Sequence, residues 1–264
     1  MPPNFETLLI ETLAPHVQLV MLNRSEVSNA FNTQMAKDLI TLFEGFSLDT
    51  GDVRALVLTG SGSRAFCAGG DLKERNGMSD AAWGAQHLLY ERMVRAVLGC
   101  PVPTIGAVNG AAYGGGCELV AALDFFYAAE TAKFAQTEVK IGIIPGAGGT
   151  QTLARAVGER RAKELILSGT PFTAAQALEW GLLNAIYPQD DLLPATVETA
   201  ERIAANAPIA TRQAKQAIHK GLQMRLAGRL AFEIEAYYRT IPTADRREGV
   251  AAFNEKRKPK FEGR

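Results

Sequence analysis

The chain lacks net charge, long apolar runs and a recognisable targeting segment. Its 264 residues include 28 basic and 28 acidic side chains, so the formal net charge is zero. A neutral chain has no global electrostatic attraction to nucleic acid or to an anionic membrane. No apolar run reaches the roughly 18 residues of a membrane span, and residues 1–6 lack the basic and apolar parts of a signal peptide. We therefore expect a cytoplasmic protein with no nucleic-acid or membrane partner.

Cysteine and histidine are also scarce. The three cysteines, Cys67, Cys100 and Cys117, are odd in number and show no paired spacing, which predicts reduced thiols. The three histidines lie far apart in the sequence and away from the cysteines, so no metal site is predicted. Cys117 has no neighbouring histidine to activate it, and a small buried thiol is the better interpretation.

Two glycine-rich stretches resemble nucleotide-binding motifs, but each lacks a required part. Residues 60–65 match the G-x-G-x-x-A fingerprint, yet the loop runs on where a helix must begin and no acidic residue ends a second strand. Residues 145–151 lack the lysine of a phosphate-binding loop, which favours a structural helix start. We therefore expect no separate cofactor.

What is present is an ordinary globular composition, with 47% hydrophobic and 21% charged residues. Short apolar runs predict strands at residues 17–22, 55–59, 104–108 and 125–129, with a further short one within 134–144. Helical spacing predicts helices at residues 33–46, 81–98 and 115–123. Thr33 is expected to cap the first of these helices, and residues 60–70 are expected to form a loop.

Alternating strands and helices predict a parallel α/β core, which we assign to residues 1–195. The pattern then changes to helices alone, and residues 196–264 are expected to form a helical appendage. Its helices are predicted at 193–206, 208–225, 226–240 and 244–254. On one of them Arg212, Lys215 and His219 share a face, which leaves open an RNA-binding surface beside the more usual solvated face.

Glycine-dense turns and two carboxylates are the main chemical signal. Residues 65–73 and 109–118 each contain consecutive glycines just before a helix start, so free N–H groups such as those of Gly70 and Gly115 can meet a ligand oxygen. Such donors stabilise negative charge that develops on an oxygen. A turn that needs conformational freedom, or tight packing of the helix on the sheet, is the structural alternative.

Glu118 and Glu138 lie beside these turns. Glu118 occupies the first turn of an otherwise apolar helix, where burial raises the pKa of a carboxyl toward neutral pH and suits it to proton transfer. A carboxylate that complements the helix dipole is the alternative for Glu118, and an ion pair with Lys140 is the alternative for Glu138. An oxyanion site with two carboxylates indicates chemistry on a carbonyl compound.

These motifs together resemble the crotonase, or enoyl-CoA hydratase/isomerase, superfamily over nearly the whole chain. Residues 66–73 look like its first oxyanion and CoA-binding segment, and residues 109–119 look like its second. Residues 136–138 and 144–151 follow in the family's order and spacing, and the tail at 245–257 is also similar. The resemblance implies a ββα-spiral core with a C-terminal helical trimerisation region, usually in a dimer of trimers.

The resemblance also implies an acyl-CoA thioester as substrate, with coenzyme A as part of it. The thioester oxygen is expected to bind the N–H groups of Gly70 and Gly115. The family's CoA-binding positions fall in this sequence on Ala68, Gly70, Asp71, Leu72, Lys73, Gly115, Phe253 and Lys256. Phe253 and Lys256 are expected to bind the CoA of this or a neighbouring subunit.

Hydratases of this superfamily carry glutamates at both positions, held here by Glu118 and Glu138, so the resemblance implies syn addition of water to a 2-enoyl-CoA. An enoyl-CoA isomerase and a branched-chain hydratase remain alternatives. Thr137, Tyr113 and Phe31 depart from common family residues and leave the acyl specificity open. The tail from residue 241 looks most like the branch that acts on acyl-CoAs such as 3-methylglutaconyl-CoA.

Overall fold

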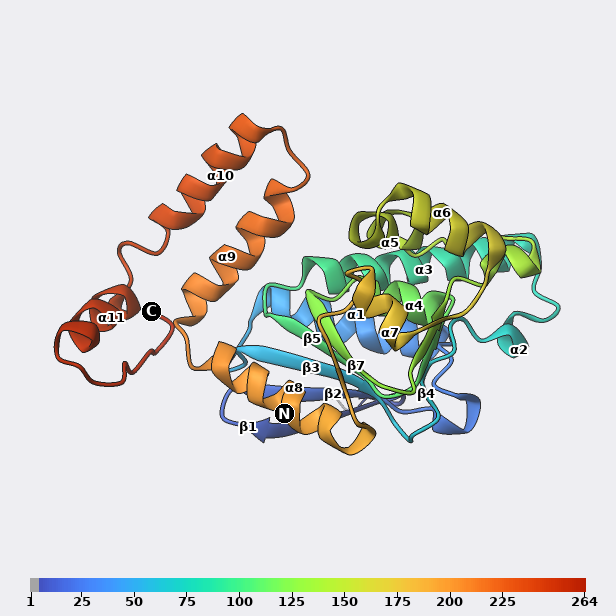
Figure 1. Cartoon of the computed structure of the whole chain (residues 1–264), viewed down its shortest axis with the longest axis horizontal. Coiled ribbons are helices and arrows are strands. Elements are labelled where there is room, and N and C mark those ends of the chain that lie inside the picture. The colour runs from blue at the N-terminus through green and yellow to red at the C-terminus, as the bar shows by residue number, and fades with distance from the viewer. Residues whose placement is uncertain (1–4) are drawn as a thin grey trace.

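The predicted alternation of strands and helices is confirmed, and it builds two sheets within the described part of the chain (Figure 1). The computed structural model describes residues 5–264, so the first four residues of the N-terminal segment discussed above lie outside it. The first sheet contains, in order, β1 (Leu8–Ala14), β2 (Val17–Leu22), β3 (Ala55–Gly60), β5 (Thr104–Val108), β7 (Phe125–Ala129) and β10 (Ala185–Tyr187). The second contains β4 (Ala65–Cys67), β6 (Ala111–Tyr113), β8 (Lys133–Ala135) and β9 (Phe172–Thr173).

Three repeats of strand, strand and helix generate this arrangement. In each repeat the first strand (β3, β5 or β7) joins the first sheet in parallel, and the next strand (β4, β6 or β8) joins the second sheet in parallel. After β4 and β6 a helical segment returns the chain to the first sheet, whereas after β8 the chain first adds β9 to the second sheet and then reaches β10. The ββα-spiral core that the sequence resemblance implied is therefore confirmed.

Both faces of the first sheet are covered by helices, with α1 and α3 on one face and α8 on the other. The described helices are α1 (Thr33–Leu48), α2 (Leu72–Arg75), α3 (Asp80–Gly99), α4 (Gly115–Ala121), α5 (Gly149–Val157), α6 (Glu159–Ser168), α7 (Ala174–Glu179), α8 (Gln189–Ala204), α9 (Pro208–Gly221), α10 (Leu226–Tyr238) and α11 (Ala244–Asn254). Two short 3-10 helices, η1 (Ser25–Val27) and η2 (Glu138–Ile141), complete the described elements.

Successive side chains of a strand point to opposite faces of the sheet. On β3, Leu56 and Leu58 point into the larger core, which also holds apolar residues of α1 and α3. Ala55 and Val57 point the other way and pack with α8 in a second cluster. Because both faces are covered, β3 is buried along its whole length, as its unbroken apolar sequence predicted.

Local details differ from the sequence expectations. Asn32 rather than Thr33 caps α1, because the Asn32 side chain accepts the N–H of Met35 at 2.9 Å. The expected loop at 60–70 contains the short strand β4, whose three residues are all buried. The further short strand expected within 134–144 is β8, at Lys133–Ala135, and η2, which carries Glu138, follows it.

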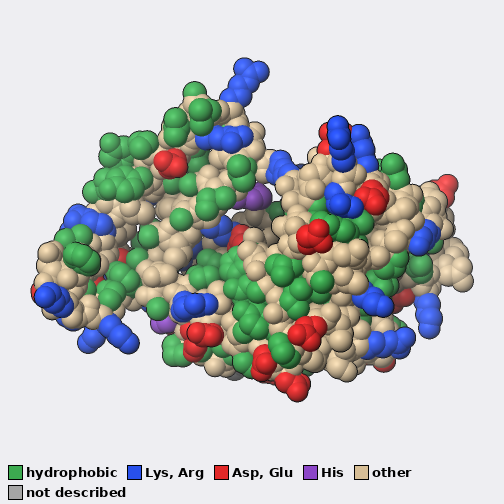
Figure 2. Space-filling model, in the orientation of Figure 1, with side chains coloured by type: hydrophobic (Ala, Val, Ile, Leu, Met, Phe, Trp, Pro, Cys, Tyr) green, Lys and Arg blue, Asp and Glu red, His purple; other side chains and the backbone are tan. Residues whose placement is uncertain are grey.

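The C-terminal helices α9, α10 and α11 form a helical arm that extends from the core (Figure 1). The predicted division at residues 195 and 196 falls inside α8, which packs on the sheet, so the arm itself begins at α9. Figure 2 shows hydrophobic side chains along the arm. Its exposed large apolar residues include Leu226, Leu230, Ile234, Tyr237, Tyr238 and Phe253.

Two helical glycines provide a matched test of the core packing. A Cβ at Gly116 in α4 would overlap the carbonyl oxygen of Cys67, whereas a Cβ at Gly45 in α1 meets nothing within 4 Å. We expect Gly116→Ala to lower the free energy of unfolding by about 1–3 kcal/mol through overpacking. Gly45→Ala should raise it by about 0.5–1 kcal/mol through helix propensity. Urea unfolding of both variants measures this, and equal effects would contradict the proposed contact between α4 and β4.

Candidate active site

The two glycine segments lie against each other although about 45 residues separate them in the sequence. Gly69 has a φ of +95°, and a Cβ there would lie 2.7 Å from the carbonyl oxygen of Tyr113 and 3.2 Å from the amide nitrogen of Gly115. Glycine is required at position 69 both for this backbone angle and for this approach. Parallel pairing of β4 with β6 holds the two segments in register.

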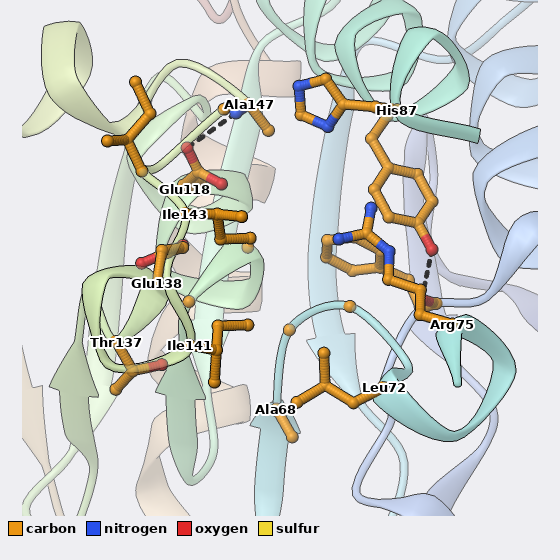
Figure 3. A pocket seen from close by; sticks show the side chains of 18 residues that line it. Ala68, Leu72, Arg75, His87, Glu118, Thr137, Glu138, Ile141, Ile143 and Ala147 are labelled. Carbon is orange, nitrogen blue, oxygen red and sulfur yellow. Dashed lines mark hydrogen bonds between the residues drawn. The ribbon is translucent and has the colours of Figure 1, made fainter. Parts of the chain in front are cut away.

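Gly70 and Gly115 line one small pocket of about 100 Å³ (Figure 3). Among the loop and cap hydrogen bonds of the described residues, neither donates its N–H to another backbone oxygen. Gly115 begins α4, where N–H groups have no partner within the helix. The two donors that the sequence indicated therefore face the same pocket, and each remains available to an oxygen atom there.

Glu118 also lines the pocket, and its carboxylate is held by backbone amides. Its Oε1 atom accepts the N–H groups of Ala147 and Gly149, each at 2.8 Å. Gly149 is the first residue of α5, so this helix start presents donors to the carboxylate. Burial raises the pKa of Glu118, and the two amide hydrogen bonds oppose that rise.

Glu138 lies on η2 and lines the same pocket. It is buried, and none of the ion pairs among residues 5–264 joins it to Lys140. The pKa of Glu138 is raised to about 7, mainly by burial and to a smaller extent by the negative charge of Glu118. With its amide oriented to satisfy both groups, Gln136 donates to the two Glu138 oxygens at 3.2 and 3.1 Å.

This arrangement combines an oxyanion site with an acid and a base. Burial raises the pKa of both glutamates, but two backbone amides oppose the rise at Glu118, whereas the Glu118 charge adds to the rise at Glu138. Two carboxyl groups in different environments can then serve as base and acid at the same pH. Such a site can add or remove a proton on each side of a carbonyl compound whose oxygen is bound at Gly70 and Gly115.

Comparison with known proteins agrees with this geometry. Residues 14–264 match the family model described as Enoyl-CoA hydratase/isomerase. The chain belongs to the enoyl-CoA hydratase/isomerase family. It is 43% identical to the YngF protein of Bacillus subtilis over 98% of this chain and 99% of that relative. It is 40% identical to a mitochondrial enoyl-CoA hydratase of Pongo abelii over 98% of this chain and 88% of that relative.

A solved structure supports the same assignment at the level of fold. The crystal structure of an enoyl-CoA hydratase from Bacillus anthracis superimposes with a TM-score of 0.96 at 41% identity. The match covers 98% of this chain and 100% of that one. The crotonase-type α/β fold, with its helical C-terminal region, is therefore confirmed for this enoyl-CoA hydratase/isomerase family member.

The CoA-binding residues expected near the pocket have different environments. Ala68 and Leu72 line the pocket, and Leu72 is exposed. Asp71 does not line it, because one carboxylate oxygen caps α2 and the other pairs with Arg24 at 3.0 Å. Asp71 thus shapes the segment that Gly70 belongs to, while Lys73 lies exposed at the surface.

Phe253 belongs to α11 and Lys256 follows it, and neither residue lines this pocket. Figure 1 shows α11 in the helical arm, away from α2 and α4. Phe253 is 84% exposed and Lys256 follows α11 with a φ of +55°. The structure of one chain therefore does not bring these two expected CoA-binding residues to Gly70 and Glu118. Their assignment to CoA stays a prediction that requires a second subunit.

The expected basic face of α9 turns toward the protein. Lys215 pairs with Asp124 at 2.7 Å and also donates to the carbonyl oxygen of Val102. Arg212 donates to Thr50, and burial lowers the pKa of His219. These contacts correct the interpretation of a solvated face and leave little basic surface for RNA.

The three cysteines are free and buried, as predicted, and burial raises the pKa of Cys117.

Several pocket residues carried no sequence signal. Arg75, His87, Tyr90 and Ile143 reach the pocket from α2, α3 and the segment after η2. Phe31 and Thr137, noted in the sequence as departures from common family residues, also line the pocket.

In residues 5–264 no group of three or more His, Cys, Asp or Glu side chains forms a metal-binding cluster. Over the same range, no helix has the length and apolarity that crossing a bilayer requires.

Replacing Glu138 should change stability in a pH-dependent way. A carboxyl with a folded pKa of about 7, above its ordinary 4.5, destabilises the folded state as pH rises through this interval. We expect Glu138→Gln to unfold like wild type near pH 4 and to be more stable at pH 8 by at most about 2 kcal/mol. Urea unfolding at both pH values measures this; a variant less stable at pH 8 would contradict the burial argument.

Proposed function

We propose that the protein is an enoyl-CoA hydratase that adds water reversibly to a 2-enoyl-CoA and gives a 3-hydroxyacyl-CoA. The observation that carries the proposal is the convergence of Gly70, Gly115, Glu118 and Glu138 on one pocket. The names of its relatives support the same reaction class. Coenzyme A is part of the substrate, and the proposed chemistry needs no further cofactor.

Each group has a defined role in this proposal. The N–H groups of Gly70 and Gly115 bind the thioester oxygen and stabilise the enolate-like charge of the transition state. Ionised Glu118 removes a proton from the water that attacks C3. Protonated Glu138 delivers its proton to C2, so both new bonds form on the side that faces the glutamates. This geometry gives syn addition.

Both carboxyl groups should be required for hydration of crotonyl-CoA. We expect Glu118→Gln and Glu138→Gln each to lower kcat by about 10²–10⁴-fold, because each variant loses one proton-transfer group. Glu164→Gln is the matched control, since Glu164 is an exposed residue paired with Arg161 on α6. Loss of absorbance of the enoyl thioester measures the rates. Wild-type rates in both active-site variants would remove the mechanism.

The pH profile of hydration tests the assignment of acid and base. Glu138 must be protonated to act as the acid, and its pKa is raised to about 7. We therefore expect kcat/KM to fall as pH rises above about 7 and to fall at acid pH as Glu118 becomes protonated. The alkaline decrease should disappear in Glu138→Gln. An unchanged alkaline limb in that variant would assign the acid to another group.

The isomerase and branched-chain alternatives differ in substrate, not in the oxyanion site. A panel of 2-enoyl-CoA and 3-enoyl-CoA substrates separates them, because an isomerase converts the 3-enoyl compound without net uptake of water. The burial of two glutamates in one pocket supports the hydratase.

We also propose a homo-oligomer built from trimers through the helical arm. The exposed apolar residues of the arm support this, because a monomer in water would leave them uncovered. In such an assembly, Phe253 and Lys256 of one chain would bind the CoA held by another. Light scattering should give a mass of three or six chains, and a monomer mass would contradict the proposal.

A further inference from the structure

Phe31 contacts both glycine segments that supply the proposed oxyanion donors. It lies between η1 and α1, it is buried, and it lines the pocket. Its backbone faces the first segment, because Phe31 forms an isolated parallel β-bridge with Gly70. Its ring faces the second segment, because a Cβ at Gly115 would lie only 2.3 Å from the Phe31 Cζ atom. Phe31 is therefore a direct link between the two donors.

The bridge to Phe31 fixes the direction of the Gly70 N–H. The N–H of Phe31 donates to the carbonyl oxygen of Gly69 at 2.9 Å, and the N–H of Asp71 donates to the carbonyl oxygen of Phe31 at 3.0 Å. The peptide bond between Gly69 and Gly70 is trans, so its N–H points opposite to its C=O. The Gly70 N–H therefore points away from the Phe31 backbone, and a shift of that backbone would redirect this donor.

Tyr90 of α3 holds Phe31 in this place. Its hydroxyl donates to the carbonyl oxygen of Phe31 at 3.0 Å, and its ring meets the Phe31 ring edge-on with the centroids 4.8 Å apart. Tyr90 is buried, and burial raises the pKa of its hydroxyl, so the group stays protonated and remains a donor. Because a hydroxyl has one hydrogen, this bond leaves Tyr90 no donor for a ligand.

We propose that Tyr90 is a positioning residue for the hydration reaction, which acts through Phe31 to align the two oxyanion donors. This inference rests on the proposed hydratase function. The Tyr90 hydroxyl holds the Phe31 carbonyl, the Phe31 backbone holds residues 69–71, and the Phe31 ring lies on Gly115. Alignment matters because a displacement of about 1 Å at a catalytic site can lower the rate by about 100-fold.

Direct contact of Tyr90 with the substrate is the competing role, because Tyr90 also lines the pocket. A direct contact would hold the substrate before reaction as well as in the transition state, so its loss would weaken binding. Aligned donors act mainly on the negative charge that develops on the thioester oxygen. Tyr90→Phe separates the two roles, because it removes the hydroxyl and keeps the ring that packs on Phe31.

Hydration of crotonyl-CoA gives the first test. We expect Tyr90→Phe to lower kcat by about 10–100-fold and to change KM by less than about 3-fold, because misaligned donors stabilise the transition state less. Tyr127→Phe is the matched control and should keep the wild-type kcat. The Tyr127 hydroxyl lies 3.3 Å from that of Thr199 on α8, and Tyr127 does not line the pocket. Thermal melting checks that both variants are folded.

A spectroscopic measurement reports on the oxyanion donors themselves. Bound acetoacetyl-CoA ionises to an enolate with a distinct ultraviolet absorbance, and part of the enolate charge lies on the thioester oxygen. We expect Tyr90→Phe to lower the ratio of bound enolate to bound neutral form by about 10-fold or more. Calorimetry should show that the Kd of butyryl-CoA, which is saturated and does not react, stays within about 3-fold of wild type.

Phe31→Leu tests whether Tyr90 acts through Phe31. This variant keeps the backbone hydrogen bonds and removes the ring that contacts Gly115 and Tyr90. Alone, it should also lower the bound enolate ratio. Combined with Tyr90→Phe, it should lower kcat by less than the product of the two single losses, because residues in contact do not act independently. A combined loss equal to that product would overturn the inference.

The remaining outcomes separate the two proposals. A higher KM with an unchanged kcat in Tyr90→Phe would assign Tyr90 to substrate contact and overturn the inference, and so would an unchanged enolate ratio. Both results leave the hydratase function standing. A wild type that does not hydrate crotonyl-CoA would overturn the hydratase function, whereas the enolate measurement would still decide whether Tyr90 aligns the donors.

Discussion

The structure depends on one interaction, in which the backbone amides of Ala147 and Gly149 hold the buried carboxylate of Glu118. A carboxylate in an apolar interior is unfavourable unless hydrogen bonds satisfy it. The start of α5 supplies these donors, and a Cβ at Gly149 would come within 2.8 Å of the Glu118 Cγ atom. The turn before α5 must therefore be glycine-rich, and the fold must bring it against α4. Residues 145–151, expected to be a structural helix start, lead into α5 as expected, and they also hold the side chain of Glu118 in place.

A difference between two similar side chains follows from this interaction. Burial raises the pKa of both Glu118 and Glu138, yet backbone donors oppose the rise at Glu118, and the charge of Glu118 adds to the rise at Glu138. The pair is an acid and a base because the fold places two unlike environments within one pocket.

The opposite wall of the pocket carries the charge that remains unbalanced. Arg75 lies over two aromatic rings, donates to Gln86 and keeps a buried Nη2 atom without a partner among the described residues. Glutamates on one wall and a cation on the other give the pocket a fixed polarity.

Sequence patterns alone were enough to predict the longer helices and strands and the residues with distinctive chemistry. Strands such as β5 and β7 were predicted at their observed bounds, because a buried parallel strand is a short apolar run, and the roles of Gly70, Gly115, Glu118 and Glu138 followed from residue type and a family resemblance. Short strands such as β4 and β9 were missed, because two or three residues carry no periodicity.

Which of these residues meet became clear from the folded chain. Asp71 forms an ion pair with Arg24 and does not line the pocket, Lys215 forms an ion pair with Asp124, and the Nη2 atom of Arg75 has no hydrogen-bond partner among the described residues. Local sequence cannot encode such contacts, because burial and charge pairing depend on segments that lie far apart along the chain. Residue type sets the chemistry that is available, and the packing of distant segments sets the pKa and the partner of each group.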